Sequence, residues 1–399
     1  MEPKSTNEAE RSDFLWRMVL GRVAYSPVRI NWGSKSIKST VSLPQPAYPA
    51  ARAVATRIHP HYLQYLAGSE LLPDIPSIEA LIDVAFWASL RREELHTPLI
   101  SLAYASPEHV ELPLIFERPV RLAAQPLTRL GPAVERPGIH LCVWHRDGEL
   151  EVWGATRLLP PFCFVLEVVA PGLLVVKHSR GGESGKFVNV AVLQGDEVKI
   201  VDQDAAGAPS KFHSGDSVNV LIQLAVSMRE HGRGGSLLVV PAETEAWKES
   251  ILQPVNYAVA PFRVLANLMR EDPPGRTRRR WQEALRRAVD AVAGLTAVDG
   301  ATVITDQYEL LAFGAKIVRR KGCGQVSLVS STEPILGTVA TVAEPGQLGG
   351  TRHLSAAQFA HDQRDAIAMV ASQDGRFTVF GWSDAEGIVN ANRIETLLL

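Results

Sequence analysis

Cysteine is scarce in this sequence, and no apolar run is long enough to cross a bilayer. The three cysteines are Cys142, Cys163 and Cys323. They lie far apart and lack the paired spacing of a zinc site or a disulfide framework, which favours a reducing cytoplasm. The longest apolar stretch, residues 162–176, is interrupted by Glu167 and by Pro171-Gly172. We therefore expect a cytoplasmic protein without a membrane span.

A strong net charge is also missing. The charge of -2 at pH 7 argues against general nucleic-acid binding. The run at residues 276–280 is locally basic, but it follows Pro273-Pro274-Gly275 and precedes a helical pattern. We interpret this run as a solvated helix entrance. The first eleven residues are polar and charged, and they predict no secretory signal.

The length predicts two domains. The chain has 399 residues, of which 46% are hydrophobic, and this is more than one ordinary domain needs for its core. We place the boundary in the segment 204–215, because its small, polar and Pro/Gly-containing sequence is typical of a linker. The expected domains are residues 1–215 and residues 216–399.

The N-terminal domain is predicted to be mostly antiparallel β. Residues 1–70 show no sustained period, so an irregular start is expected. One helix is expected near residues 77–94, with Ser77 as its N-cap. Asp147-Gly148 lies between two apolar runs and predicts a hairpin. Further strands are expected at 164–168, 173–178, 188–193 and 197–201.

The C-terminal domain is predicted to be α/β (α+β), with a mixed central sheet flanked by helices. A helix ending at His231-Gly232 precedes an apolar strand at 236–240. A second helix should stop at Gly294, before a strand at 302–305. Later expected elements are runs at 310–313 and 316–318, a helix after Thr351, and strands at 366–371 and 376–380.

Two short motifs in this domain carry the functional hypothesis. Asp299-Gly300-Ala301 precedes a strand, and Gly350-Thr351-Arg352-His353 precedes a helix. A carboxylate at a strand entrance can hold a divalent cation, and a helix start can bind phosphate oxygens through side chains and free amides. Either motif alone is an ordinary strand entry or helix cap. Their conjunction in an α/β frame favours a phosphate-and-metal site.

Residues 217–395 resemble the diadenylate cyclase (DAC) domain, the N-terminal domain of DNA-integrity scanning proteins. The resemblance rests on both motifs, on the helix and glycine-rich turn at 231–235, and on the pattern from Leu310 to Ile317. That pattern is similar to the family's adenine-contacting strand. The chain also resembles a divergent branch of this superfamily, the DACNV group, which is regarded as a group of nucleotide sensors.

The resemblance implies a role for each matching residue. Asp299 would bind Mg²⁺ or Mn²⁺ and, in an enzyme, help to activate a ribose 3′-hydroxyl. Thr351, Arg352 and His353 would hold phosphates at the helix N-terminus. The other nucleotide contacts that the resemblance implies are Gly300, Ala301, Phe313, Gly314, Ile317 and Ser372.

The sequence departs from the active family members at three places. They have arginine at the position of Leu354, and they usually have glutamate at the position of Gln373. A neutral amide is a poorer Mg²⁺ ligand than a carboxylate, and a lost phosphate-binding cation lowers the rate of phosphoryl transfer. The long segment between Val318 and Gly350 is expected to cover or reshape the pocket. His361 and Asp362, on the following helix, are expected to be exposed.

The leading hypothesis is a nucleotide-binding sensor that recognises an adenine nucleotide or a cyclic dinucleotide. The alternative is an active diadenylate cyclase, which joins two ATP molecules into cyclic di-AMP and requires a homo-oligomer formed through the C-terminal domain. A third reading is an interaction scaffold with a non-functional pocket.

Two further patterns do not favour a ligand site. The glycine spacing at residues 181–186 is one short for a phosphate-binding loop, and Phe187 stands where Ser or Thr is required, so we expect a hairpin turn. No carboxylate or cysteine cluster accompanies His59 and His61, which we place in a solvated loop.

Overall fold

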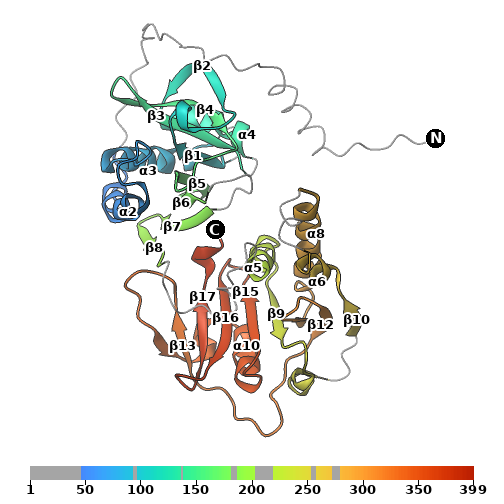
Figure 1. Ribbon diagram of the computed structural model, residues 1–399. Helices are drawn as coiled ribbons and strands as arrows, with labels where there is room; N and C mark the ends of the chain where they lie inside the picture. The colour runs from blue at the N-terminus through green and yellow to red at the C-terminus, as the bar shows by residue number, and fades with distance from the viewer. Residues whose placement is uncertain are drawn as a thin grey trace, which may run out of the picture. The chain divides into compact units, whose positions relative to one another are not determined.

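The chain forms two compact units in the computed structural model, residues 1–171 with 179–186, and residues 172–178 with 187–399 (Figure 1). The structure describes residues 46–92, 97–135, 138–180, 187–202, 219–252, 258–271 and 279–399. The expected linker at 204–215, the glycine-rich segment 181–186 and residues 276–278 of the basic run lie outside these ranges. Nowhere in the described ranges does a helix combine the length and the apolar character that crossing a membrane requires.

The N-terminal unit contains a mixed sheet with helices. Five strands follow one another in the order β2-β4-β3-β1-β5. They are β1 (Ile100–Tyr104), β2 (Leu114–Arg121), β3 (His140–Arg146), β4 (Glu149–Thr156) and β5 (Phe164–Ala170). β1 and β3 are parallel, and the other neighbouring pairs are antiparallel. The helices are α2 (Ala51–Leu66), α3 (Ile75–Ser89) and α4 (Ala124–Val134), and η1 (Pro107–His109) is a short 3-10 helix.

The predicted strands of the N-terminal half are confirmed. Asp147 and Gly148 connect β3 to β4 with φ angles of 51° and 83°. Positive φ at both positions is what a two-residue type I′ hairpin turn requires. The other expected strands are present as β5, β6 (Leu173–Ser179), β7 (Phe187–Gln194) and β8 (Glu197–Ile200).

The helices of the N-terminal half differ from the prediction. Helix α2 is regular where an irregular start was expected, and it buries Val54, Ile58 and Tyr62. His59 and His61 lie on this helix and not in a loop. Helix α3 begins at Ile75, because its N-cap is Asp74, whose carboxylate accepts a hydrogen bond of 2.9 Å from the Ser77 amide. Helix α4 was not expected at all.

The C-terminal unit contains a mixed sheet, as the sequence predicted, and this sheet has nine strands. Its order is β10-β12-β11-β9-β15-β16-β17-β13-β14. The strands are β9 (Gly235–Val240), β10 (Ala258–Phe262), β11 (Ala301–Thr305), β12 (Leu310–Ala315), β13 (Val329–Thr332), β14 (Thr341–Ala343), β15 (Ile367–Ala371), β16 (Phe377–Ser383) and β17 (Ile388–Arg393). The pairs β9/β11 and β13/β17 are parallel, and the other pairs are antiparallel.

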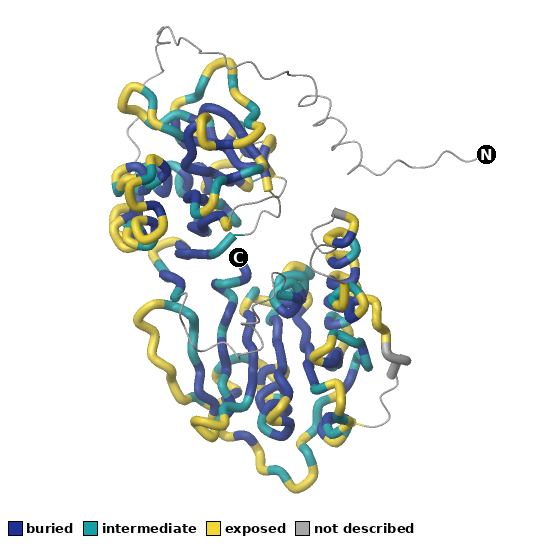
Figure 2. The backbone as a smooth tube through the Cα atoms, viewed as in Figure 1, coloured by how far each residue is buried: buried dark blue, intermediate teal, exposed yellow. Residues whose placement is uncertain are grey.

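Helices cover both faces of this sheet. Leu237 and Val239 of β9 pack with α5 (Val220–Glu230), α6 (Val264–Met269) and α8 (Arg279–Leu295), whereas Leu238 and Val240 pack with α10 (Thr351–Asp362). The short elements are η3 (Ala246–Ser250), α9 (Pro345–Leu348) and η4 (Glu395–Leu397). Successive strand residues point to opposite faces, so burial on both sides explains why β9 is a continuous apolar run. Figure 2 shows the central strands buried along their length.

The long segment between Val318 and Gly350 mainly extends the sheet. Its strand β13 pairs with β17, and β14 pairs with β13 at the sheet edge. Val339 and Val342 beside this edge are 78% and 64% exposed. Only its last residues approach the predicted site, because Leu348 and Gly349 line a cavity with Gly350.

Candidate functional site

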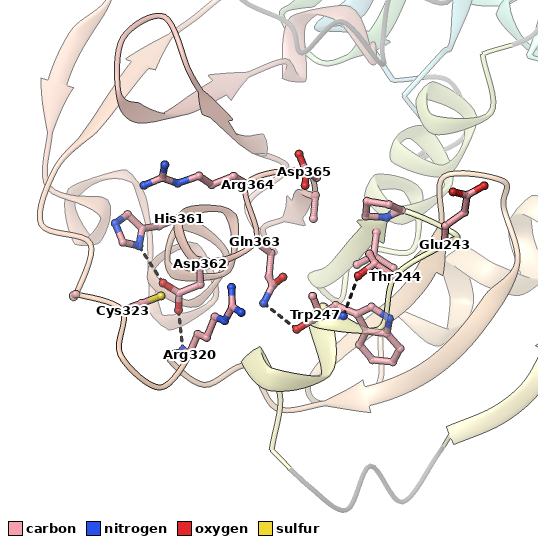
Figure 3. A pocket seen from close by; sticks show the side chains of 15 residues that line it. Glu243, Thr244, Trp247, Arg320, Cys323, His361, Asp362, Gln363, Arg364 and Asp365 are labelled. Carbon is pink, nitrogen blue, oxygen red and sulfur yellow. Dashed lines mark hydrogen bonds and ion pairs between the residues drawn. The ribbon is translucent and has the colours of Figure 1, made fainter.

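Two cavities of similar size lie at opposite ends of helix α10. One, of about 740 Å³, is lined by Trp247, Arg320 and the last turn of α10, and we call it the Trp247 cavity (Figure 3). The other, of about 750 Å³, is lined by Asp299, Arg352 and the first turn of α10, and we call it the Arg352 cavity. Their volumes are typical of small-molecule sites, so the chemistry of the walls must distinguish them.

The Asp362 carboxylate in the Trp247 cavity connects the end of α10 to the segment that begins at Arg320. Its Oδ1 accepts hydrogen bonds of 2.9 Å from His361 Nδ1 and from Gln358 Nε2, and its Oδ2 accepts one of 2.8 Å from the Arg320 amide. The expectation that His361 and Asp362 are exposed was wrong, since Asp362 is only 5% exposed and His361 is partly buried. The cause is tertiary, because the segment from residue 320 to 326 folds over the end of α10.

Two other polar side chains of the Trp247 cavity are engaged in the same way. Gln363 Nε2 donates to the Ala246 carbonyl at 3.0 Å and to Ser250 Oγ at 2.8 Å. Arg320 Nε donates to a Glu249 carboxylate oxygen at 2.7 Å. These bonds tie α10, the 320–326 segment and η3 to one another, as several of the labelled side chains in Figure 3 show. Asp362, Gln363 and Arg320 therefore form a structural junction in the wall of the Trp247 cavity.

The Arg352 cavity brings the two sequence motifs together. Ala301 of β11 pairs with Ser236 of β9, and Ala371 at the end of β15 pairs with Gly235. The starts of β9 and β11 and the end of β15 therefore lie at the same end of the sheet, beside the N-terminus of α10. The expected residues in the wall are Asp299, Gly300, Ala301, Ile317, Thr351, Arg352, His353 and Ser372. The expected contacts Phe313 and Gly314 are not wall residues.

Sequence reasoning missed several members of this wall. They are Ser236, Lys316, Ser355, Asp374 and Arg376. Signals for some of them exist in the sequence. Ser236 begins the apolar run of β9, Lys316 precedes the expected adenine contact Ile317, and Asp374 and Arg376 follow Ser372 in a turn.

Gly300 allows the start of β11 to approach the backbone of β12 closely, on the side of the cavity wall that faces away from the cavity. Its φ is +101°, and a Cβ atom built there would lie 2.5 Å from the carbonyl carbon of Gly314. Gly314 itself has a φ of 65°. Only glycine combines this backbone conformation with such a close approach. Gly314 thus shapes the cavity from behind without lining it.

The N-terminus of α10 has the features that bind anions in other proteins. Its N-cap, Gly350, has no side chain to bond the first turn. The His353 amide donates to the Gly350 carbonyl at 3.0 Å, so the Thr351 and Arg352 amides are the ones left for a ligand or water. Arg352 is exposed and forms no ion pair with any residue that the structure describes. Its guanidinium lies against Gly234, where a Cβ atom would come within 3.1 Å of Nη1. The helix dipole and this guanidinium both favour negative charge.

His353 differs from its neighbours because its ring is buried. It is 2% exposed, its Nε2 lies 3.5 Å from Thr378 Oγ1, and its ring meets that of Phe380 edge-on. Loss of solvation lowers the pKa of His353 below the ordinary value of 6.5. The imidazole is therefore neutral at pH 7, so Arg352 is the cation that this motif supplies.

The remaining wall charges are of both signs. Asp299 is exposed, and Asp374 pairs with Arg376 at 3.3 Å. Among the described residues, no group of three or more His, Cys, Asp or Glu side chains is arranged to hold a metal ion. Mg²⁺ is commonly held by one or two carboxylates together with substrate phosphates and water. Asp299 is a single carboxylate, so it would need the phosphates of a ligand to complete a Mg²⁺ or Mn²⁺ site.

The two residues that depart from the active family pattern have different places. Leu354 is 38% exposed and is not a wall residue of the Arg352 cavity. Gln373 is in the wall, and its Nε2 donates to the Arg233 carbonyl at 3.4 Å. A side chain that anchors the turn before β9 is a poor substitute for a second metal-binding carboxylate.

A family model described as "Probable sensor domain DACNV" matches residues 67–157. The matched segment runs from just before α3 to the end of β4, within the N-terminal unit. No curated protein matches the chain. The match supports a relation to the DACNV family and agrees with a sensory role. The motifs at residues 299–301 and 350–353 lie outside the matched segment, so the resemblance of residues 217–395 to a DAC domain stays a prediction.

Proposed function

We propose that the chain is a sensor that binds an adenine nucleotide or a cyclic dinucleotide in the Arg352 cavity. The observation that carries the proposal is the grouping in one wall of the uncapped α10 N-terminus, the guanidinium of Arg352 and the carboxylate of Asp299. A helix N-terminus with a free arginine binds phosphate groups. Ile317, partly buried in the same wall, offers an apolar surface for a base.

Sensing is favoured over catalysis because two positions that carry charge in active family members, Leu354 and Gln373, are neutral in this chain. Phosphoryl transfer depends on neutralising the charge that develops on the phosphates and on the leaving group. Leu354 supplies no cation, His353 is neutral at pH 7, and Gln373 is an amide. Such a site retains groups that hold a nucleotide but lacks several that accelerate its reaction. The DACNV match in the N-terminal unit supports the same choice.

The alternative function is diadenylate cyclisation, and the presence of Asp299 in the same cavity wall as the first turn of α10 favours it. In that reaction each ATP 3′-hydroxyl attacks the α-phosphate of the other ATP, and two pyrophosphates leave as cyclic di-AMP forms. Asp299 would hold Mg²⁺ or Mn²⁺. Two copies of the C-terminal unit would have to meet, so this function requires a homo-oligomer.

Incubation with ATP and Mn²⁺, followed by mass spectrometry, separates the two functions. The sensor proposal expects no cyclic di-AMP. Product that forms with the purified chain and disappears in Asp299→Ala would replace the sensor with the enzyme.

Calorimetry with ATP and with cyclic di-AMP tests the binding itself. Charge-assisted hydrogen bonds contribute about 1.5–3 kcal/mol, so Arg352→Gln should weaken binding about ten- to a hundredfold. Arg319→Gln is the matched control, because Arg319 is exposed and is not a wall residue. A wild-type chain that binds neither nucleotide would leave only the scaffold. An Arg352→Gln variant that binds as tightly as wild type would refute binding in the Arg352 cavity.

A further inference from the structure

Lys316 is a second cation in the wall of the Arg352 cavity, and neither sequence motif includes it. It follows Ala315, the last residue of β12, and precedes Ile317. Its side chain is exposed, and in the described part of the chain its ammonium group has no hydrogen-bond or ion-pair partner. The group is therefore available to a ligand.

The backbone that carries Lys316 is held firmly. The Leu252 amide donates to the Lys316 carbonyl at 2.8 Å, and the Val318 amide donates to the Ser250 carbonyl at 2.9 Å. Ile251 and Ile317 form the antiparallel bridge between these two bonds. A fixed backbone leaves only the lysine side chain to be ordered on binding, which reduces the entropic cost.

The other basic groups of the wall are less available than Lys316 and Arg352. Arg376 shares its charge with Asp374 at 3.3 Å, and His353 is neutral at pH 7 because its ring is buried. The two unpaired cations come from different elements, since Lys316 follows β12 whereas Arg352 belongs to α10. Two cations on separate parts of one wall can hold two phosphate groups at once.

We propose that Lys316 is the second phosphate-binding cation of the Arg352 cavity, and that the ligand is a nucleotide with at least two phosphate groups. A nucleoside triphosphate and a cyclic dinucleotide share this chemistry, whereas a nucleoside monophosphate lacks it. The inference rests on the proposed function, because it takes nucleotide binding in this cavity as given. Arg352 offers a planar fork of donors at the helix N-terminus, and Lys316 offers a compact charge that adapts to the second phosphate.

Calorimetry on the full chain without added metal tests the inference. The ligands are ATP, cyclic di-AMP and AMP, and the variants are Lys316→Gln, Lys316→Arg and the matched control Lys321→Gln. Lys321 is an exposed lysine of the same segment outside the cavity wall. Lys316→Gln should weaken the preferred two-phosphate ligand about tenfold or more, with little effect on AMP. Lys316→Arg should retain most of the affinity, and the ATP and cyclic di-AMP titrations show which ligand the cavity prefers.

The possible failures are distinguishable. If wild type binds ATP or cyclic di-AMP and Lys316→Gln binds it equally well, the role of Lys316 is refuted while the proposed function stands. If Lys321→Gln weakens binding as much as Lys316→Gln, the effect comes from the overall positive charge of the segment and not from a contact of Lys316 with the ligand. The inference is then also refuted. If wild type binds AMP as tightly as both larger ligands, the two-phosphate class is wrong. A wild-type chain that binds none of the three overturns both proposals.

Discussion

Replacing Gly300 by alanine should loosen the strand pair that supports the Arg352 cavity. The added Cβ would lie 2.5 Å from the carbonyl carbon of Gly314, 2.7 Å from its oxygen and 2.9 Å from the Ala315 nitrogen. All three are backbone atoms of the paired strand, so no side chain can move away to relieve the contact. Alanine at a φ of +101° is also strained in itself.

Two costs add in Gly300→Ala. A residue held in a sparsely populated backbone region costs about 1–3 kcal/mol, and forcing a methyl group into a packed interior costs about 1–3 kcal/mol more. We therefore expect a loss of about 2–6 kcal/mol in the local free energy of opening. The change is local to β11 and β12, so nucleotide binding should weaken together with their protection.

Hydrogen exchange measured by mass spectrometry reports this opening free energy for peptides that cover β11 and β12. Gly294→Ala is the matched control, because Gly294 lies in helix α8 with open space around its Cβ position. The same chemical change there should stabilise the helix by up to about 1 kcal/mol. Gly300→Ala with wild-type protection of β11 and β12 would refute the steric argument.

Two other predictions concern titration and the Trp247 cavity. The pKa of the His353 imidazole is lower in the folded state than in the unfolded state. As the pH falls, the imidazole is therefore protonated first in the unfolded chain. The contribution of His353 to stability is lost as the pH falls from about 6.5 through the folded pKa. Urea unfolding of His353→Gln should therefore show a weaker loss of stability between pH 7.5 and 5.5 than wild type, and an equal loss would contradict the buried neutral ring. Asp362→Ala leaves the Arg320 amide without its acceptor, which costs about 1–3 kcal/mol, and exchange in residues 320–326 should speed up. Unchanged protection of that segment would show that the carboxylate does not hold it.

Local signals explain which parts of the fold could be predicted. The hairpin turn requires positive φ angles, and Asp147 and Gly148 are residue types that adopt them. The apolar run of β9 follows from the burial of this strand on both faces. Helix α2 was missed because Pro60 interrupts its sequence, and a proline within a helix is ordinarily unfavourable. β13 and β14 were missed because both strands are short and are defined by their pairing, β13 with β17 and β14 with β13, and not by their own sequence pattern.

The candidate site shows the same division. Asp299 and Arg352 could be placed together because strand entrances and a helix start lie at the same end of the sheet in an α/β frame. The burial of His353 could not be predicted, because it depends on contacts with Thr378 and Phe380 of strand β16. The place of Asp362 depends on a segment that folds back over the helix end. Long-range packing of this kind leaves no period in the sequence.

Helix α10 has a mechanical consequence for a protein that responds to a ligand. Its twelve residues form a rod of about 18 Å, with one end at the Arg352 cavity and the other bonded through Gln358 and Asp362 to residues 320–326. Backbone hydrogen bonds repeat along a short α-helix and make it stiff, so a tilt at its first turn would also move its last turn. The 320–326 segment would then move with the last turn of α10, because Gln358 and Asp362 are hydrogen-bonded to it.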